Sequence, residues 1–260
     1  MAKKKKKKKL RIDRVIIVLV IGVAFVFGAI KLIQFTADKV TAFFNSTDEE
    51  AEVVTKKDEP TEKTYIATIV IDPGHGGEDV GANRDTLLEK DINLKIAKVV
   101  GEELDAVNVK VVYTRTTDTS LSTIKKTDLK MRGAMGAANN ADYFVSIHVN
   151  AYEGSDAISG FEVYSKDNND EAINADSKEL ATAIGNQIET LKYSENRGIQ
   201  SGKSLSVLRD NEVAGVLIET GYINNNNDYQ YLKNDKKLTA LGKAIAKGIY
   251  NQIQTKKGNK

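Results

Sequence analysis

Cysteine is absent from the 260-residue chain, and proline and histidine occur only twice each. Without thiols the chain forms no disulfide and offers no thiolate ligand, so a bound metal must rely on histidine and carboxylate groups. The absence of cysteine leaves the cellular compartment open, because many exported proteins also lack it. His75 and His148 are therefore the only imidazole groups available to a metal site.

The net charge of +2 conceals a strong asymmetry along the chain. Residues 1–33 carry ten basic residues and one acidic residue, a balance of +9, whereas the remaining 227 residues carry 28 basic and 35 acidic residues, a balance of −7. A nucleic-acid-binding protein presents its basic charge on a folded face. Here the basic charge precedes the expected fold, so we expect no nucleic-acid partner.

The N-terminal segment has the pattern of a membrane anchor. Residues 1–14 form a basic tail with an unbroken lysine run at 3–9, and residues 15–30 carry no polar side chain. At about 1.5 Å per residue, the stretch 15–33 is just long enough to cross a bilayer as a transmembrane helix. Positive charges before such a span hold the N-terminus in the cytoplasm, so we expect a single-pass cell-membrane protein whose C-terminal domain lies outside the cell. A cleaved, secreted form is the alternative, although a suitable cleavage pattern, Val40-Thr41-Ala42, lies far from the apolar run.

Residues 34–64 have the composition of a polar linker, and the pattern changes at residue 65. From there to residue 260, β-branched runs alternate with apolar residues at helical spacing. The runs predict strands at 66–72, 109–115, 143–149, 160–165, 205–208 and 214–220. Helices are predicted around 92–104, 180–191 and 238–253, with a weaker, alanine-rich helix at 131–138. This alternation predicts a single α/β domain with a mostly parallel central sheet flanked by helices.

Both histidines fall at the ends of predicted strands. His75 follows the first strand in the sequence DPGHGG, and His148 ends the third strand in SIHVNA. The carboxyl ends of strands in an open α/β sheet form the usual ligand crevice. The glycines around His75 predict a tight turn with closely approaching backbone. Each histidine taken alone is also consistent with a hydrogen-bonded strand-end residue that has no functional role. Two lone histidines at equivalent topological positions favour a functional site.

Two glutamates complete the candidate site. A catalytic zinc takes three protein ligands and leaves one position for water. Glu89 precedes the first predicted helix of the domain and is the candidate third ligand, although it would also complement the helix dipole. Glu219 closes the apolar run 214–219. Partial desolvation there would raise its pKa towards that of a general base, although an ion-paired structural carboxylate is the alternative.

Five motifs in order give the chain a resemblance to a known family: DPGHGG at 72–77, LLEKD at 87–91, TRTTD at 114–118, SIHVNA at 146–151 and ETGYINN at 219–225. Over residues 68–253 the chain resembles the zinc-dependent N-acetylmuramoyl-L-alanine amidases of the amidase_3 type. The resemblance implies a mixed α/β sheet, one Zn²⁺ per chain bound by His75, Glu89 and His148, and Glu219 as the catalytic residue. Arg132 and Ala138-Asn139 match a further recurring family segment, to which we assign a scaffold role.

The chain departs from the family pattern at a few positions. Tyr222 and Asn224 stand where the family often has phenylalanine and serine, and neither change is expected to alter the mechanism. Only about eleven residues separate Ser165 from the next predicted helix, which is too few for the inhibitory helix that some relatives insert there. We therefore do not expect control by release of such a helix.

The implied activity is hydrolysis of the amide bond between N-acetylmuramic acid and L-alanine in peptidoglycan. Another zinc hydrolase of the cell wall, such as a deacetylase or a peptidase, shares the metal chemistry and is one alternative. A non-catalytic wall-binding protein is the alternative from a different class. Asp72 and Asn150 are the nearest candidates for orienting the histidine tautomers. We expect the chain to be monomeric.

Overall fold

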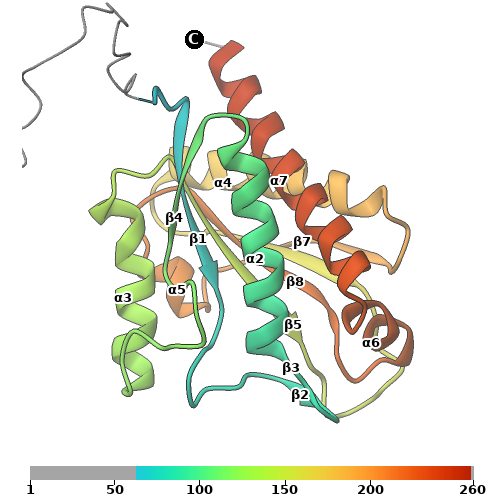
Figure 1. Cartoon of the computed structure of the whole chain (residues 1–260). Helices are drawn as coiled ribbons and strands as arrows, with labels where there is room; N and C mark the ends of the chain where they lie inside the picture. The colour runs from blue at the N-terminus through green and yellow to red at the C-terminus, as the bar shows by residue number, and fades with distance from the viewer. Residues whose placement is uncertain (1–62, 259–260) are drawn as a thin grey trace, which may run out of the picture. The chain divides into compact units, whose positions relative to one another are not determined.

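The computed structural model describes residues 63–258, which form an α/β fold with one six-stranded sheet (Figure 1). The predicted transmembrane segment 15–33 and most of the predicted linker lie outside the described residues. Within residues 63–258, no helix is both long and apolar enough to cross a membrane.

The central sheet is mixed and mostly parallel, which confirms the predicted fold class. Its strand order is β4-β1-β5-β8-β6-β7. Strands β1, β4, β5 and β8 pair in parallel, whereas β6 runs antiparallel to β8 and parallel to β7. The strands are β1 Ala67–Pro73, β4 Val109–Tyr113, β5 Tyr143–Asn150, β6 Phe161–Ser165, β7 Asn196–Ser201 and β8 Gly215–Tyr222. A separate two-stranded hairpin joins β2 Asn83–Arg84 to β3 Leu87–Leu88.

Helices cover both faces of the sheet. On one face, α7 packs against both α2 and α4, and α2 lies over β1 and β5 (Figure 1). On the other face, α3 packs against α5. The helices are α2 Glu89–Asp105, α3 Lys125–Ala138, α4 Glu171–Glu189, α5 Ser206–Arg209, α6 Asn226–Leu232 and α7 Asp235–Gly258.

Two apolar cores result from the alternation of side chains along the strands. In β1, Ile69 and Ile71 belong to the larger core under α2, α4 and α7, whereas Val70 belongs to the smaller core under α3 and α5. In β5, Val145 faces the larger core and Phe144 the smaller one. Successive strand residues point to opposite faces, so a strand buried on both sides must be apolar at nearly every position. This explains why the central strands read as continuous apolar runs.

The predicted strand at 205–208 is wrong, because this segment forms the short helix α5. Its apolar side chains Val207 and Leu208 are buried in the smaller core, and so short an apolar run does not distinguish a helix from a strand. The sixth strand is instead β7, whose sequence NRGIQS alternates between half-buried and exposed positions at the sheet edge. The alanine-rich helix α3 also begins at Lys125, earlier than predicted.

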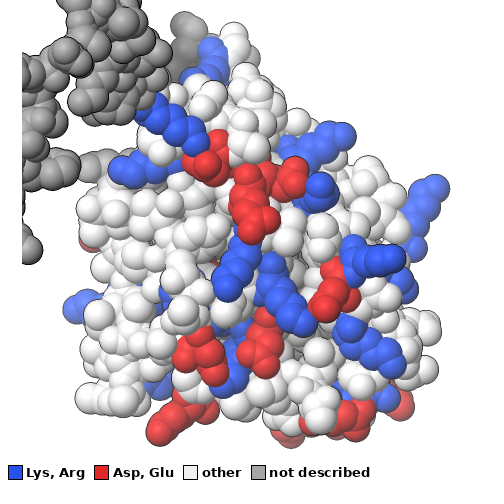
Figure 2. All heavy atoms as spheres, viewed as in Figure 1, with Lys and Arg blue, Asp and Glu red and all other residues white. Residues whose placement is uncertain are grey.

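The strand directions bring distant parts of the chain to one edge of the sheet. The parallel strands β1, β5 and β8 end there, whereas β6 and β7 begin there. The turn that carries His75, the β5 residue His148 and the β8 residue Glu219 therefore lie at the same edge. On the face seen in Figure 2, acidic and basic side chains are interspersed.

Candidate metal centre

The turn after β1 holds His75 in an unusual backbone conformation. His75 has a φ of 62°, and the next two residues, Gly76 and Gly77, have φ values of 129° and 61°. A residue other than glycine rarely adopts positive φ, and it does so only where its surroundings enforce the conformation. The predicted tight turn is confirmed.

Two buried arginines hold the turn of His75 in this conformation. Arg132, from α3, donates hydrogen bonds from Nη1 to the carbonyl oxygen of Pro73 at 2.9 Å and from Nη2 to that of His75 at 2.7 Å. Arg115, after β4, donates from Nε to Pro73 O and from Nη2 to Gly74 O, each at 2.8 Å. The carbonyl groups of three consecutive turn residues are therefore fixed by guanidinium groups. We call this arrangement the arginine clamp.

Asp72 binds Arg132 of the arginine clamp and makes no hydrogen bond to a histidine among the described residues. Its carboxylate accepts hydrogen bonds from Arg132 Nη1 at 3.0 Å, Thr114 Oγ1 at 2.6 Å and Ser146 Oγ at 2.7 Å. Burial works against ionisation, but the positive charge of Arg132 and these hydrogen bonds outweigh it and keep the pKa of Asp72 below its ordinary value. The idea that Asp72 and Asn150 orient the imidazoles is wrong: Asn150 Oδ1 accepts from the backbone N–H of Ala151.

Glu89 lies between the two histidines. It is the first residue of α2, and its Oε1 is 3.1 Å from His75 Nε2 and 2.9 Å from His148 Nδ1. The backbone N–H of Val149 donates to Oε1 at 3.0 Å, and that of Ala82 donates to Oε2 at 2.6 Å. Both carboxylate oxygens are thus held in place. The position of Glu89 suits the helix dipole, but its side chain is buried and faces the imidazoles.

The electrostatics of this cluster favour a charged carboxylate. Burial alone would raise the pKa of Glu89, but the hydrogen bonds and charges of His148 and His75 hold it well below its usual range. Burial alone would lower the pKa of His148, but Glu89 raises it above its ordinary value. The negative charge of Glu89 therefore attracts cationic character into the space between the two rings.

Two glycines make room for the cluster. A Cβ atom at Gly74 would overlap the imidazole of His148. One at Gly81 would overlap the Glu89 carboxylate and lie 2.8 Å from His75 Cδ2. Glycine at these two positions therefore lets the backbone lie directly against the imidazole of His148 and the carboxylate of Glu89.

The cluster fits a zinc ion. One ligand atom from each of His75, Glu89 and His148 lies within 4.8 Å of the others. Nδ1 of His75 is buried and has no hydrogen-bond partner within residues 63–258. Asp79 Oδ1 lies 3.0 Å from this nitrogen, but the pair lacks the alignment of a hydrogen bond. Two imidazoles and one carboxylate are a typical donor set of a catalytic zinc, which keeps a fourth position open.

Glu219 lies beside this cluster on the adjacent strand. In β8 it pairs in register with His148 of β5 on one side and with Glu162 of β6 on the other. Its Oε2 atom is buried without a hydrogen-bond partner in the described part of the chain. Burial, assisted by the carboxylates of Glu89 and Glu162 and opposed by His148, raises the pKa of Glu219 to about 7. A carboxyl group in this range exchanges protons readily near neutral pH.

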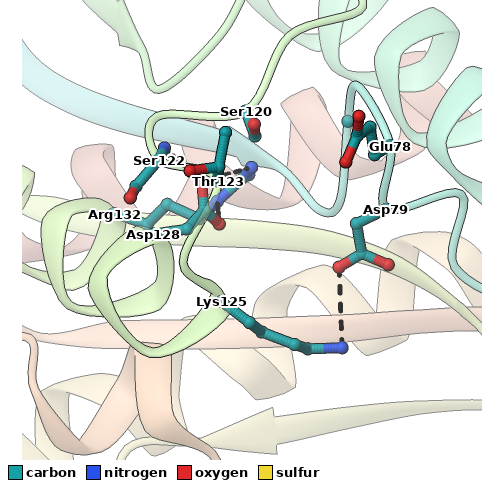
Figure 3. A pocket seen from close by; sticks show the side chains of 9 residues that line it. Glu78, Asp79, Ser120, Ser122, Thr123, Lys125, Asp128 and Arg132 are labelled. Carbon is teal, nitrogen blue, oxygen red and sulfur yellow. Dashed lines mark hydrogen bonds and ion pairs between the residues drawn. The ribbon is translucent and has the colours of Figure 1, made fainter.

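A polar cavity of about 170 Å³ flanks the turn of His75 (Figure 3). Asp79 lies at its boundary and connects it to the metal cluster, with Oδ2 3.5 Å from Lys125 Nζ and Oδ1 close to His75. The lining residues are Gly76, Glu78, Asp79, Ser120, Ser122, Thr123, Lys125, Asp128 and Arg132. A group bound in this cavity would lie next to the candidate ligands.

Several residues of the site carry no role in the sequence-based interpretation. Arg115 lies within the motif TRTTD, but nothing in the motif indicates that its side chain reaches the turn of His75. Glu162 is buried and receives a 2.5 Å hydrogen bond from the Tyr222 hydroxyl, which a phenylalanine could not make. Spacing along the chain gives no signal for either contact.

We expect wild-type protein to bind one Zn²⁺ per chain, and His75→Ala and His148→Ala to lose it, because each removes one of three ligands. Metal content after dialysis, measured by mass spectrometry, checks this. Lys125→Ala is the matched control, since Lys125 lines the neighbouring cavity without reaching the cluster, and it should retain zinc. Full zinc occupancy in either histidine variant would contradict the ligand assignment.

Comparison with known proteins agrees with this geometry. The family model described as N-acetylmuramoyl-L-alanine amidase matches residues 69–251. The chain is 38% identical over 166 residues to N-acetylmuramoyl-L-alanine amidase LytC of Bacillus subtilis, covering 64% of this chain and 31% of LytC. It is 36% identical over 185 residues to the probable cell wall amidase LytH of Staphylococcus aureus, covering 70% of this chain and 57% of LytH.

A solved structure extends the likeness to the whole fold. The crystal structure of N-acetylmuramoyl-L-alanine amidase from Clostridium difficile superposes with a TM-score of 0.66 at 32% identity, over 75% of this chain and 99% of that one. The chain spans less than two thirds of LytC and of LytH but nearly all of this structure. The family match covers well over half of the sequence and includes all four candidate site residues. The chain belongs to the N-acetylmuramoyl-L-alanine amidase family.

Proposed function

We propose that the chain is a zinc-dependent hydrolase that cuts the amide bond between N-acetylmuramic acid and L-alanine in peptidoglycan. The observation that carries this proposal is the convergence of His75, Glu89 and His148 next to the carboxyl group of Glu219, at one sheet edge. Membership of the amidase family supports the choice of bond. His75, Glu89 and His148 would hold the metal, and Glu219 would remain outside its ligand set.

The residues of the chain divide the chemistry between them. His75, Glu89 and His148 would hold a zinc ion, which would supply the Lewis acidity that lowers the pKa of water and polarises a carbonyl group. Glu219 accepts the proton of the attacking water and returns it to the nitrogen of the departing L-alanine. Its pKa of about 7 suits both transfers near neutral pH, because the group accepts and releases a proton at similar cost.

The surrounding contacts keep the ligands in place before substrate arrives. The N–H groups of Val149 and Ala82 hold the two oxygens of Glu89, and the arginine clamp holds the backbone of His75. Groups that are already oriented need no reorganisation during the reaction. This preorganisation supports a catalytic site over a wall-binding surface, which has no need of a fixed His-Glu-His cluster with a carboxyl group beside it.

Digestion of purified peptidoglycan tests the bond that is cleaved. We expect new amino termini on L-alanine and no new reducing sugar ends, because cleavage at the lactyl amide leaves the glycan strand intact. Labelling of the new amino groups followed by mass spectrometry identifies the residue. Released acetate would indicate a deacetylase, and labelled residues further along the stem would indicate a peptidase; either result would refute the proposal.

Glu219→Gln is the variant that links this activity to the site. The substitution preserves the shape of the side chain but removes its ability to accept a proton, so turnover should fall by roughly 10²–10⁴. Zinc content should remain that of the wild type, because Glu219 is outside the ligand set. Wild-type turnover in this variant would remove Glu219 from the mechanism.

We further propose that the N-terminal segment anchors the enzyme in the cell membrane, with residues 65–260 outside the cell as the catalytic domain. The basic run at 3–9 and the segment 15–33, apolar throughout residues 15–30, support this arrangement. The polar composition of residues 34–64 suits a tether that lets the domain reach the wall.

Fractionation of cells that produce the full chain tests the anchor. The intact protein should sediment with membranes, and protease added outside spheroplasts should digest the domain. A variant without residues 1–33 should leave the membrane fraction. Intact full-length protein found only in the cytosol, or a shortened form found only in the medium, would contradict the anchor.

A further inference from the structure

Arg197 lies at the same sheet edge as the metal cluster and has no part in the mechanism above. We propose that its guanidinium group binds the carboxylate of the second residue of the stem peptide, and so makes the enzyme selective for stems that carry this charge. The inference rests on the proposed function, because it assigns the substrate group that the same site recognises.

The strand register places Arg197 two strands from Glu219. Glu219 of β8 pairs with Glu162 of β6, and Phe161 of β6 pairs with Asn196 of β7. Neighbouring strands are about 4.8 Å apart, so the backbones of Glu219 and Arg197 are separated by roughly 10 Å. The Arg197 side chain extends towards β6, where its Nε lies 3.3 Å from Glu162 Oε1. The guanidinium group is therefore nearer to β8 than the Arg197 backbone is.

Arg197 is held in one orientation by contacts along its length. A Cβ atom at Gly160 would lie 2.7 Å from Arg197 Cγ and Cδ, so the aliphatic part of the side chain rests on the bare glycine backbone. The guanidinium carbon lies 5.7 Å from the centre of the Tyr222 ring. An arginine ordered in this way loses little conformational entropy when it binds an anion.

The contacts of Arg197 differ from those of the two arginines in the clamp. Arg115 and Arg132 are buried, and each donates at least four hydrogen bonds to protein groups. Arg197 has 36% of its side chain exposed, and its one side-chain hydrogen bond among the described residues is a 3.5 Å contact from Nη1 to Ser159 O. Most of its N–H groups remain available to a ligand.

The need to neutralise the charge of Glu162 does not by itself explain why an arginine lies at position 197. Oε1 of Glu162 accepts a 2.5 Å hydrogen bond from the Tyr222 hydroxyl, and Oε2 accepts one of 3.1 Å from the Tyr164 hydroxyl. The carboxylate therefore has a donor on each oxygen without the arginine. The printed contact of Arg197 to Glu162 is made at Nε, and neither Nη atom donates a hydrogen bond to Glu162 among residues 63–258. The outer edge of the fork, where Nη1 makes a 3.5 Å contact to Ser159 O, can therefore receive a second carboxylate.

The position of the Arg197 guanidinium group determines which residue of the stem peptide it can contact. An extended peptide advances about 3.3–3.6 Å per residue, so a carboxyl group on the second stem residue lies roughly 7 Å from the scissile amide nitrogen. This length is of the same order as the two-strand separation, roughly 10 Å at the backbone, between Glu219 and Arg197, whose side chain extends back to Glu162. Because the planar fork of arginine matches a carboxylate in two parallel hydrogen bonds, a neutral carboxamide at the same place would bind less well.

Two synthetic muramoyl-peptide substrates test the proposal: one has a free carboxylate on the second stem residue and the other has a carboxamide there. We expect the zinc-loaded full chain to prefer the carboxylate by roughly tenfold to a hundredfold in kcat/KM, which is the range of one charge-assisted interaction. The preference should be expressed mainly in KM, because the contact is made in both the bound substrate and the transition state.

Arg197→Gln should remove the preference by weakening cleavage of the carboxylate substrate, with cleavage of the carboxamide substrate and zinc content unchanged. Arg197→Lys keeps the charge but not the fork, so it should retain only part of the preference. Arg209→Gln is the charge-matched control, since Arg209 ends α5 and pairs with the neighbouring Asp210, and it should behave as wild type.

The outcomes separate this inference from the proposed function. If wild type cleaves both substrates equally, or if Arg197→Gln keeps the preference, the inference is overturned and the amidase activity stands. If wild type cleaves neither substrate, the proposed function fails and the inference fails with it. Should Arg197→Gln not fold, a full wild-type preference in Arg197→Lys overturns the fork contact.

Discussion

The hydrogen bonds from Arg132 and Arg115 to the carbonyl groups of the β1 turn are the contacts on which the geometry of the candidate metal centre depends. They hold His75 at a φ of 62°, which places its imidazole beside Glu89 and His148. Arg132 also connects Asp72 of β1 to Asp128 of α3, so the turn, the sheet and the helix are fixed by one buried group. Removing one member of such a buried pair costs about 3–5 kcal/mol, because its partner is left buried and uncompensated.

The glutamates near this turn differ in their burial and hydrogen bonding. Glu89 is held at both oxygens and stays charged, which suits its proposed role as a ligand, whereas Glu219 has one oxygen without a hydrogen-bond partner among the described residues and a raised pKa, which suits its proposed role as a proton acceptor. Glu162, on the other side of Glu219, accepts one hydrogen bond from each of two tyrosine hydroxyls. Glu89, Glu219 and Glu162 lie at one sheet edge, but they differ in how far their carboxyl oxygens are hydrogen-bonded because each has different donors.

The sequence predicts the four central residues because each has a local signal and each falls in a motif that resembles one family. His75 follows the apolar strand β1, His148 lies near the end of β5, Glu89 is the first residue of α2, and Glu219 follows the apolar run at the start of β8. The parallel topology then brings these positions to one sheet edge. Strand β7 escapes prediction because an edge strand needs no continuous apolar run. The clamp escapes prediction for a different reason: Arg132 and Asp72 are 60 residues apart, and nothing local marks their contact.

The central claim is that His75, Glu89 and His148 hold one zinc ion while Glu219 remains free to transfer a proton. Anomalous X-ray diffraction at the zinc edge, on crystals of the zinc-loaded protein, tests it most directly. The account predicts a single peak at about 2.0–2.2 Å from one atom of each of the three ligands, with Glu219 beyond ligand distance. A peak elsewhere, a second peak of equal height, or direct coordination by Glu219 would contradict it.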